Sequence, residues 1–168
     1  KKYYVSRTDD VMVVEVSASK PGSIDLEIEL DRAGRAAEEL TSEGLLKFSG
    51  TLDSGTEAPG MSYCAYTKVM TDGEVTYPQG GDPCIRVSSA DKVWIIISAA
   101  TDYFSKDYES MALSRLESMS PRKMRIAHKE AVKAHQELYL RNTLSLSCGT
   151  TREIKATDKR ISDYATGA

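Results

Sequence analysis

The feature that most limits what this chain can fold into is the apolar run VWIIISAATDYF at residues 93–104. Its apolar part is well short of the roughly 20 residues that a membrane-spanning helix needs. A continuous apolar run of this length, ending in polar residues, is typical of a strand that is buried on both faces in the middle of a sheet. We therefore expect Val93, Ile95 and Ile97 to be fully buried and Ile96 to be largely buried.

The residues before this run show the pattern of successive strands. The clearest is 23–30, where apolar side chains alternate with serine, aspartate and glutamate, so that one strand face is wet. Lys20-Pro21-Gly22 predicts a turn between this strand and another at 11–18. Further strands are predicted at 1–7, 45–52, 61–70, 74–77 and 85–88, with Thr71-Asp72-Gly73 as a hairpin turn. Strands spaced in this way, without helices between them, favour an antiparallel β-sandwich.

From about residue 108 the apolar spacing changes to that of helices. A short helix is predicted to end before Ser120, and Ser120-Pro121 is a strong signal for the start of the next helix. That helix, to about residue 139, places these side chains on one face: Met124, His128, Ala131, His135 and Leu138. Thr157-Asp158 predicts one more short helix. The chain thus divides into a β-sandwich at 1–104, a helical linker at 105–147 and a polar segment at 148–168.

Charge and cysteine content narrow the class of protein. The net charge is −3 with both signs interspersed, which gives no basic face for nucleic acid. The three cysteines, Cys64, Cys84 and Cys148, form no CxxC pair and have no histidine at zinc-finger spacing, so free thiols are favoured over a metal site. A bridge between Cys64 and Cys84 stays open if the protein is exported.

The residue types that carry catalysis form no convincing site. His128 and His135 share a helix face but lie roughly 10.5 Å apart along it, too far to share a metal. Glu27 and Glu29 share a strand face, as an acid/base pair would, but a solvated strand face explains them equally well. The sequence contains no GxSxG motif and no evident catalytic triad.

Glycines and aromatic residues also favour structural roles. Gly80-Gly81 lacks the context of a phosphate-binding loop. Exposed tyrosines could stack on sugars, but Tyr66 and Tyr77 fall in or beside predicted strands, where packing within the sheet is the simpler interpretation. We therefore predict no catalytic residue, no cofactor and no metal ligand in this chain.

Several stretches together resemble one family. Residues 1–32 contain an aromatic pair before serine, an Asp-Val turn, a Lys-Pro-Gly turn and a strand ending in Leu-Asp-Arg. Residues 60–65 with Val69, and the run IIISAATDYF, resemble the strands that follow in that family. A further set of residues resembles the linker of that family: Leu138-Tyr139, Arg141, Leu144, Leu146, Thr157-Asp158 and Arg160-Ile161. These motifs are similar to the N-terminal domain and linker of family 95 glycoside hydrolases, the α-L-fucosidase group.

The resemblance implies a mainly β fold of the galactose-mutarotase-like, or family 65/95 N-terminal, supersandwich type, with helices at the C-terminal end. This chain would correspond to the second half of that sandwich and the linker, with 148–168 leading into a catalytic helical barrel. The substrate would be a fucosylated glycan, with terminal α-L-fucose removed by inverting hydrolysis in the barrel. The family also implies a periplasmic or secreted protein, although the sequence itself leaves the compartment unknown.

Two alternatives remain open from the sequence. The chain could be a stand-alone carbohydrate-binding module or a purely structural β-sandwich module. Half of a supersandwich would expose strand edges and apolar faces. Either a second copy, giving a homo-oligomer, or the chain's own helices would cover them, and self-association is the favoured expectation.

Overall fold

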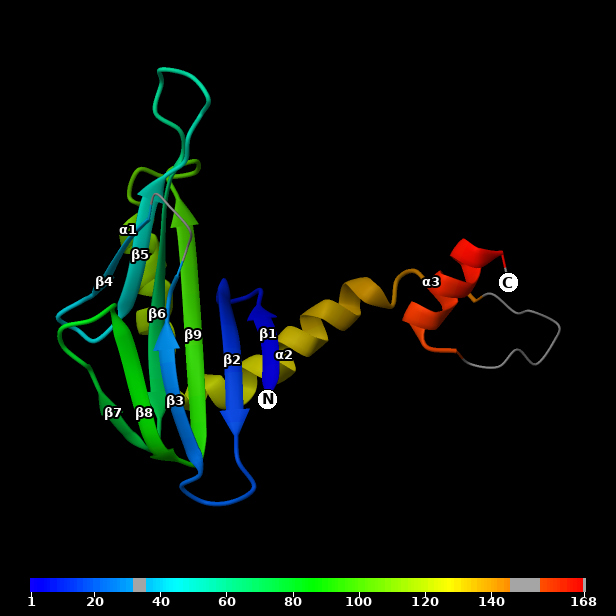
Figure 1. Ribbon diagram of the computed structural model, residues 1–168, viewed down its shortest axis with the longest axis horizontal. Helices are drawn as coiled ribbons and strands as arrows, with labels where there is room; N and C mark the ends of the chain where they lie inside the picture. The colour runs from blue at the N-terminus through cyan, green and yellow to red at the C-terminus, as the bar shows by residue number, and fades with distance from the viewer. Residues whose placement is uncertain (32–35, 146–154, 168) are drawn as a thin grey trace. The chain divides into compact units, whose positions relative to one another are not determined.

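The computed structural model describes residues 1–31, 36–145 and 155–167 (Figure 1). Two compact units are present, Lys1–Glu137 and Leu138–Ala168. The strands are β1 (Lys2–Ser6), β2 (Val11–Ser17), β3 (Ile24–Glu29), β4 (Ala36–Leu40), β5 (Leu46–Thr51), β6 (Ser62–Thr71), β7 (Glu74–Thr76), β8 (Cys84–Ala90) and β9 (Lys92–Thr101). The helices are α1 (Tyr108–Ser118), α2 (Pro121–Tyr139) and α3 (Thr157–Thr166).

The strands form two stacked antiparallel sheets. The large sheet has the order β1-β2-β9-β6-β5-β4, and the small sheet has the order β3-β8-β7. All pairings are antiparallel. The small sheet packs on one face of the large sheet, and α1 packs on the other (Figure 1). The predicted antiparallel sandwich with helices at its C-terminal end is therefore confirmed.

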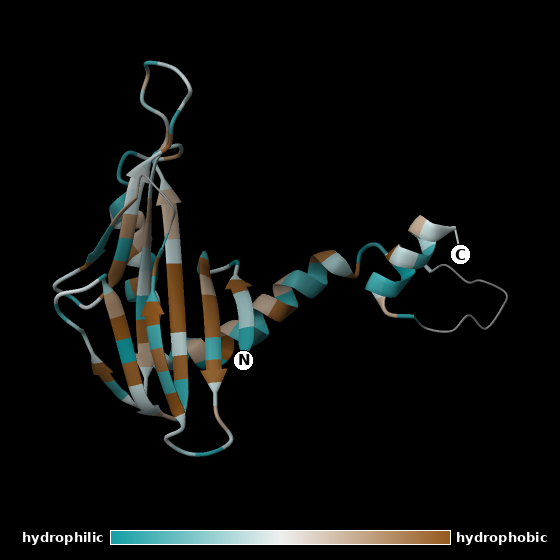
Figure 2. Ribbon diagram, viewed as in Figure 1, coloured by the Kyte–Doolittle hydropathy of each residue, from teal (hydrophilic) through white to brown (hydrophobic). Residues whose placement is uncertain are grey.

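Most of the apolar run at 93–104 forms β9, which lies in the interior of the large sheet between β2 and β6. Ile96 is fully buried on the helix side, in a cluster with Val13, Leu116 and Met124. Val93 is fully buried on the opposite side, where the small sheet covers it. The strand is thus covered on both faces, and Figure 2 shows the band of apolar residues along it.

The expectation that Ile95 and Ile97 are fully buried is wrong. Both are only half-buried. They lie on the face of β9 that turns toward the small sheet, and the small sheet ends at β3. Because β3 does not extend over β2 and β1, the cover is incomplete at this flank of the sandwich.

The predicted hairpin at Thr71-Asp72-Gly73 is also corrected. The turn does join β6 to β7, but these strands lie in different sheets and do not pair. The chain changes sheets here, and it does so again beside this corner at Asp91, between β8 and β9. Asp72 Oδ1 accepts hydrogen bonds from the backbone N–H groups of Asp91 and Lys92, each at 3.0 Å, which joins the two corners.

Strand β4, AAEEL, has no counterpart among the predicted strands. Its alanines, glutamates and leucine are good helix formers, so local propensity argues against a strand. Pairing with β5 along five residue pairs overrides that preference at the edge of the large sheet. Tertiary context therefore decides the structure of this segment.

The helical region agrees with the expected boundaries. Helix α2 begins at Pro121, and the Ser120 hydroxyl accepts a hydrogen bond from the backbone N–H of Lys123 at 3.3 Å, as an N-cap does. Its packed face contains Met124 and Ala127, which are buried, and His128, which is half-buried. In contrast to the predicted face, His135 and Leu138 are exposed.

The second compact unit contains α3, which begins at the predicted Thr157 with Asp158 in its first turn. The predicted polar segment overlaps residues that lie outside the described ones, Leu146 and Cys148 among them. No helix within 1–31, 36–145 and 155–167 is long and apolar enough to cross a membrane.

Candidate functional site

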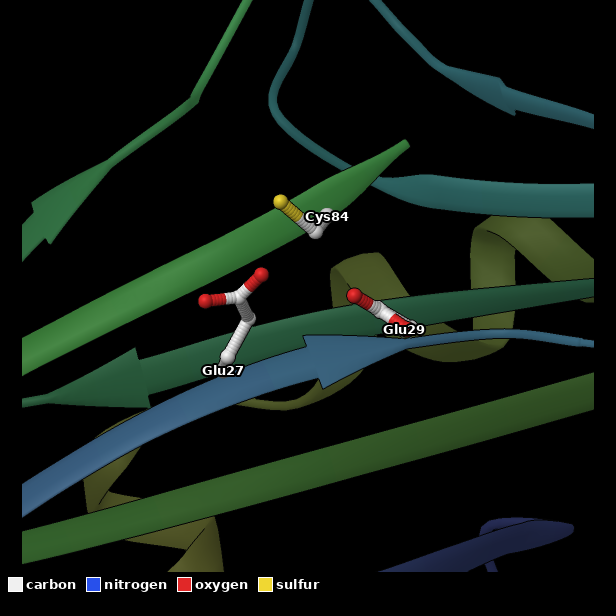
Figure 3. A group of neighbouring side chains, drawn as sticks. All are labelled: Glu27, Glu29 and Cys84. Carbon is white, nitrogen blue, oxygen red and sulfur yellow. The ribbon is translucent and has the colours of Figure 1, made fainter. Parts of the chain in front are cut away.

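Three potential metal-ligating or nucleophilic side chains meet on the outer face of the small sheet. Antiparallel pairing places Glu29 of β3 opposite Cys84 of β8, and Glu27 opposite Arg86. Because alternate residues of a strand share a face, Glu27, Glu29 and Cys84 project to the same side (Figure 3). Their carboxylate oxygens and thiol sulfur all lie within 4.8 Å of one another.

Arg86 sets the electrostatics of this group. Its Nε and Nη2 donate hydrogen bonds to Glu27 Oε2 at 3.1 and 2.7 Å. This contact lowers the pKa of the Glu27 carboxyl below its usual value. Burial, helped by the negative charge of Glu27, raises the pKa of the Cys84 thiol, so the thiol is protonated at neutral pH.

The group is poorly suited to the chemistry that its residue types suggest. To hold a metal ion, Cys84 would have to lose a proton whose pKa is raised, and Glu27 would have to give up its hydrogen bonds with the Arg86 guanidinium. A general acid needs a raised carboxyl pKa, but that of Glu27 is lowered. The carboxylate oxygens are also closer than the roughly 6.5–9.5 Å separation of inverting glycosidases. Glu27 and Glu29 are exposed, as expected for a solvated strand face.

The cysteines of the two sheets do not meet. Cys64 is a buried free thiol in β6 and belongs to the cluster between the large sheet and the helices. Cys84 is a free thiol on the outer face of the small sheet. The alternative of a bridge between them is therefore excluded, while Cys148 lies outside the described residues.

A second feature is a groove of about 440 Å³ between the loop that follows β4 and the loop that joins β7 to β8. Tyr77 lies in it with 43% of its surface exposed. Polar groups come from Thr41, Ser42 and Gln79, and glycines and prolines form most of the remainder. None of the lining residues is charged.

The position of Tyr77 depends on Gly44. Gly44 has a φ of +74°, which favours glycine, and a Cβ there would collide with the Tyr77 hydroxyl oxygen. The ring can therefore lie directly against the loop backbone. The interpretation of Tyr77 as sheet packing is wrong, whereas Tyr66 is 3% exposed and does pack on the large sheet, on the side that α1 covers. Gly80-Gly81 also lines the groove, a role that the local sequence does not indicate.

The chain is thus a β-sandwich domain with an uncharged groove on its surface. Among the described residues, no two carboxylates have the separation and pKa values of a pair that catalyses inverting hydrolysis. Comparison with protein families gives the same class. Residues 1–106 match the family described as glycosyl hydrolase family 65, N-terminal domain. The match covers most of the chain, and the chain belongs to this family. Comparison with curated proteins finds no significant match.

Proposed function

We propose that this chain is a non-catalytic part of a glycoside hydrolase that removes terminal α-L-fucose, or a related sugar, from glycans. The observation that carries the glycoside hydrolase assignment is the family match over residues 1–106, which spans all nine described strands. The finer assignment to fucose rests on the motifs that resemble family 95. The geometry of Glu27 and Glu29 supports a non-catalytic role, because their carboxylate oxygens are too close for an inverting pair and Arg86 lowers the pKa of the Glu27 carboxyl.

The proposed reaction is a one-step inversion. Water attacks the anomeric carbon of an α-L-fucoside, the glycosidic bond breaks, and the alcohol leaves with a proton from a general acid. The first product is therefore β-L-fucose. Residues of a catalytic barrel outside this chain would supply the acid and the base.

The experiment is to express the complete reading frame that contains this segment and to offer it aryl α-L-fucoside, α-D-galactoside and α-D-glucoside. The expected result is selective cleavage of the fucoside, with the β-anomer appearing first by NMR. Cleavage of the glucoside alone would reject the fucose assignment and retain the glycoside hydrolase class. A first product in the α-configuration would reject inversion.

The groove around Tyr77 favours a second candidate function, carbohydrate binding by this domain. An exposed aromatic ring offers a face to the C–H groups of a sugar, and neutral hydroxyl and amide groups offer hydrogen bonds without attracting ions. NMR titration with methyl α-L-fucoside and methyl α-D-glucoside tests this. Shifts around Gly44 and Gly80 that vanish in Tyr77→Ala, but persist in Tyr103→Ala at another exposed tyrosine, are expected.

A further inference from the structure

The groove around Tyr77 is built from two loops that carry no positive charge. One loop follows β4 and the other joins β7 to β8, and together they supply the residues that line the groove. Residues 40–44 and 77–83 contain no lysine, arginine or histidine. Each loop contains one acid, Glu43 in the first and Asp82 in the second, and both acids are exposed.

Glu43 and Asp82 border the groove without lining it. Each lies between two residues that do line it, at a Cα–Cα spacing of roughly 3.8 Å from both. Charges in water at physiological ionic strength are largely screened only beyond roughly 8–10 Å. The two carboxylates are therefore close enough to act on the charge of a molecule bound in the groove.

The cations of the adjoining strands are already paired. The four strands that the two loops join, β4, β5, β7 and β8, contain two cations, Lys47 and Arg86. Lys47 Nζ lies 3.2 Å from a carboxylate oxygen of Glu39 and 3.2 Å from one of Glu109, and Arg86 Nη2 lies 2.7 Å from Glu27. The charge beside the groove is thus negative, and such a charge disfavours an anionic ligand.

The loop between β7 and β8 offers hydrogen-bonding groups that suit a neutral ligand. In the part of the chain that the structure describes, the backbone N–H groups of Gln79, Gly80 and Gly81 donate no hydrogen bond. The Cβ positions of Gly80 and Gly81 have no atom within 4 Å, so the backbone there is open. Gln79 donates from Nε2 to the Tyr77 carbonyl oxygen at 3.2 Å, which leaves its Oε1 as an acceptor. A sugar hydroxyl both donates and accepts, so it can use all of these groups.

The Tyr77 ring supplies the apolar surface beside these polar groups. It is 43% exposed and lies against the loop backbone at Gly44. A neutral sugar can place its C–H face on the ring and its hydroxyls on the loop. An acidic sugar of the same shape adds a carboxylate or sulfate that no cation of the groove can receive, and an unpaired charge that loses water is costly.

We propose that the Tyr77 groove selects neutral sugars against acidic ones. Glu43 and Asp82 disfavour a carboxylate or sulfate, and the bare backbone of Gly80-Gly81 is the surface that the sugar hydroxyls contact. This selectivity rests on carbohydrate binding by the groove, the second function proposed above, and adds the class of sugar. Two unit charges about 8 Å from an anion in water weaken its binding about fivefold at low ionic strength.

The first test compares matched pairs of sugars by NMR titration at about 10 mM salt. Methyl α-D-glucoside is set beside methyl α-D-glucuronide, and methyl α-L-fucoside beside its 4-sulfate. In each pair that binds, the neutral sugar should bind about fivefold more tightly, and the ratio should approach one at 1 M salt. The double variant Glu43→Gln/Asp82→Asn should also bring the ratio close to one while its affinity for the neutral sugar is unchanged.

The control is Glu117→Gln/Glu137→Gln, which makes the same change of net charge at exposed positions of α1 and α2. It should keep the fivefold ratio. Acidic sugars that bind as tightly as their neutral partners overturn the selectivity and leave carbohydrate binding intact. If no sugar of either pair binds, carbohydrate binding is rejected and the selectivity with it.

The second test fills the space above the glycines. Gly81 does not have a positive φ and its Cβ position is open, so Gly81→Leu should leave the melting temperature unchanged. The added side chain should weaken binding of the neutral sugar at least about tenfold. Ala58→Leu, at an exposed residue of the loop between β5 and β6, is the control and should bind normally. If Gly81→Leu lowers the melting temperature, Gly81→Ala takes its place. Unchanged binding by the folded variant overturns the assignment of the Gly80-Gly81 contact.

Discussion

The carboxylate of Asp72, in the corner between β6 and β7, accepts a 3.0 Å hydrogen bond from the backbone N–H of Asp91, in the corner between β8 and β9. The same oxygen accepts a second bond from the N–H of Lys92. Asp91 in turn accepts a 2.6 Å bond from the backbone N–H of Gly22, in the connection from β2 to β3. Three connections that change sheets are therefore held together at one end of the sandwich.

Asp72→Ala is expected to lower the melting temperature, because two backbone donors lose their acceptor. The N–H groups of Lys92 and Asp91 lower the pKa of Asp72 from 3.8. Its contribution to stability is thus present above about pH 3.8 and is lost as the pH falls through the lowered value. Melting curves between pH 2 and pH 7, with Asp82→Ala as the control in the loop between β7 and β8, check this. Equal effects of the two substitutions would contradict it.

Replacing isoleucines of β9 with alanine should show that the small sheet covers only part of this strand. Ile96→Ala is expected to cost about 2–5 kcal/mol in the free energy of unfolding, because its side chain is fully buried and leaves a cavity. Ile97→Ala, at a half-buried position on the side of β9 that faces the small sheet, should cost about 1–2 kcal/mol. Urea unfolding of both variants gives the comparison. Equal costs would mean that Ile97 is covered as completely as Ile96.

Glu15 is a buried carboxylate in the large sheet, with 6% of its surface exposed. Lys92 Nζ lies 3.1 Å from its Oε1, and the indole N–H of Trp94 donates to its Oε2 at 3.3 Å. Burial alone would raise the pKa of Glu15, but the contacts with Lys92 and Trp94 outweigh it and lower the pKa below 4.5.

Glu15→Gln should therefore cost about 2 kcal/mol near neutral pH. A lowered native pKa gives stability that is present above about pH 4.5 and disappears as the pH falls through the native value. The difference in unfolding free energy between the original protein and the Glu15→Gln variant should therefore shrink as the pH falls below about 4.5. Exposed Glu117→Gln is the control, and a difference that does not depend on pH would refute the assignment.

Gly44→Ala tests the arrangement of the groove. The added Cβ would strain a backbone with positive φ and would also displace the Tyr77 ring. Gly55→Ala is a matched control, because Gly55 has a similar φ of +70° but open space around its Cβ position. We expect both to lose about 1 kcal/mol of stability from backbone strain. Only Gly44→Ala should alter the Tyr77 ring signals in an NMR spectrum.

Local sequence patterns predicted those strands, turns and helices whose intrinsic preference agrees with the structure that their tertiary contacts require. The alternation in β3, the turn at Lys20-Pro21-Gly22 and the Ser120-Pro121 helix start each act within a few residues, so they are visible in the sequence. Strand β4 could not be found in this way, because pairing with β5 overrides its helix-forming residues.

The candidate sites depend on contacts between distant parts of the chain. Cys84 joins Glu27 and Glu29 only through the register between β3 and β8. Tyr77 is exposed in a groove because of Gly44, which belongs to a different loop. The half-burial of Ile97 follows from the width of the small sheet, which no single segment specifies. The fold class is therefore visible in the sequence, whereas these contacts between distant segments become visible only in the folded structure.

We expect no catalytic pair among residues 1–31, 36–145 and 155–167 of this glycosyl hydrolase family 65 N-terminal domain. The most direct test is release of nitrophenol from aryl α-L-fucoside, α-D-galactoside and α-D-glucoside by the purified chain, beside the double variant Glu27→Gln/Glu29→Gln. We expect no release of nitrophenol above the buffer blank from either protein. Turnover of any of these substrates by the original chain that the double variant loses would contradict it.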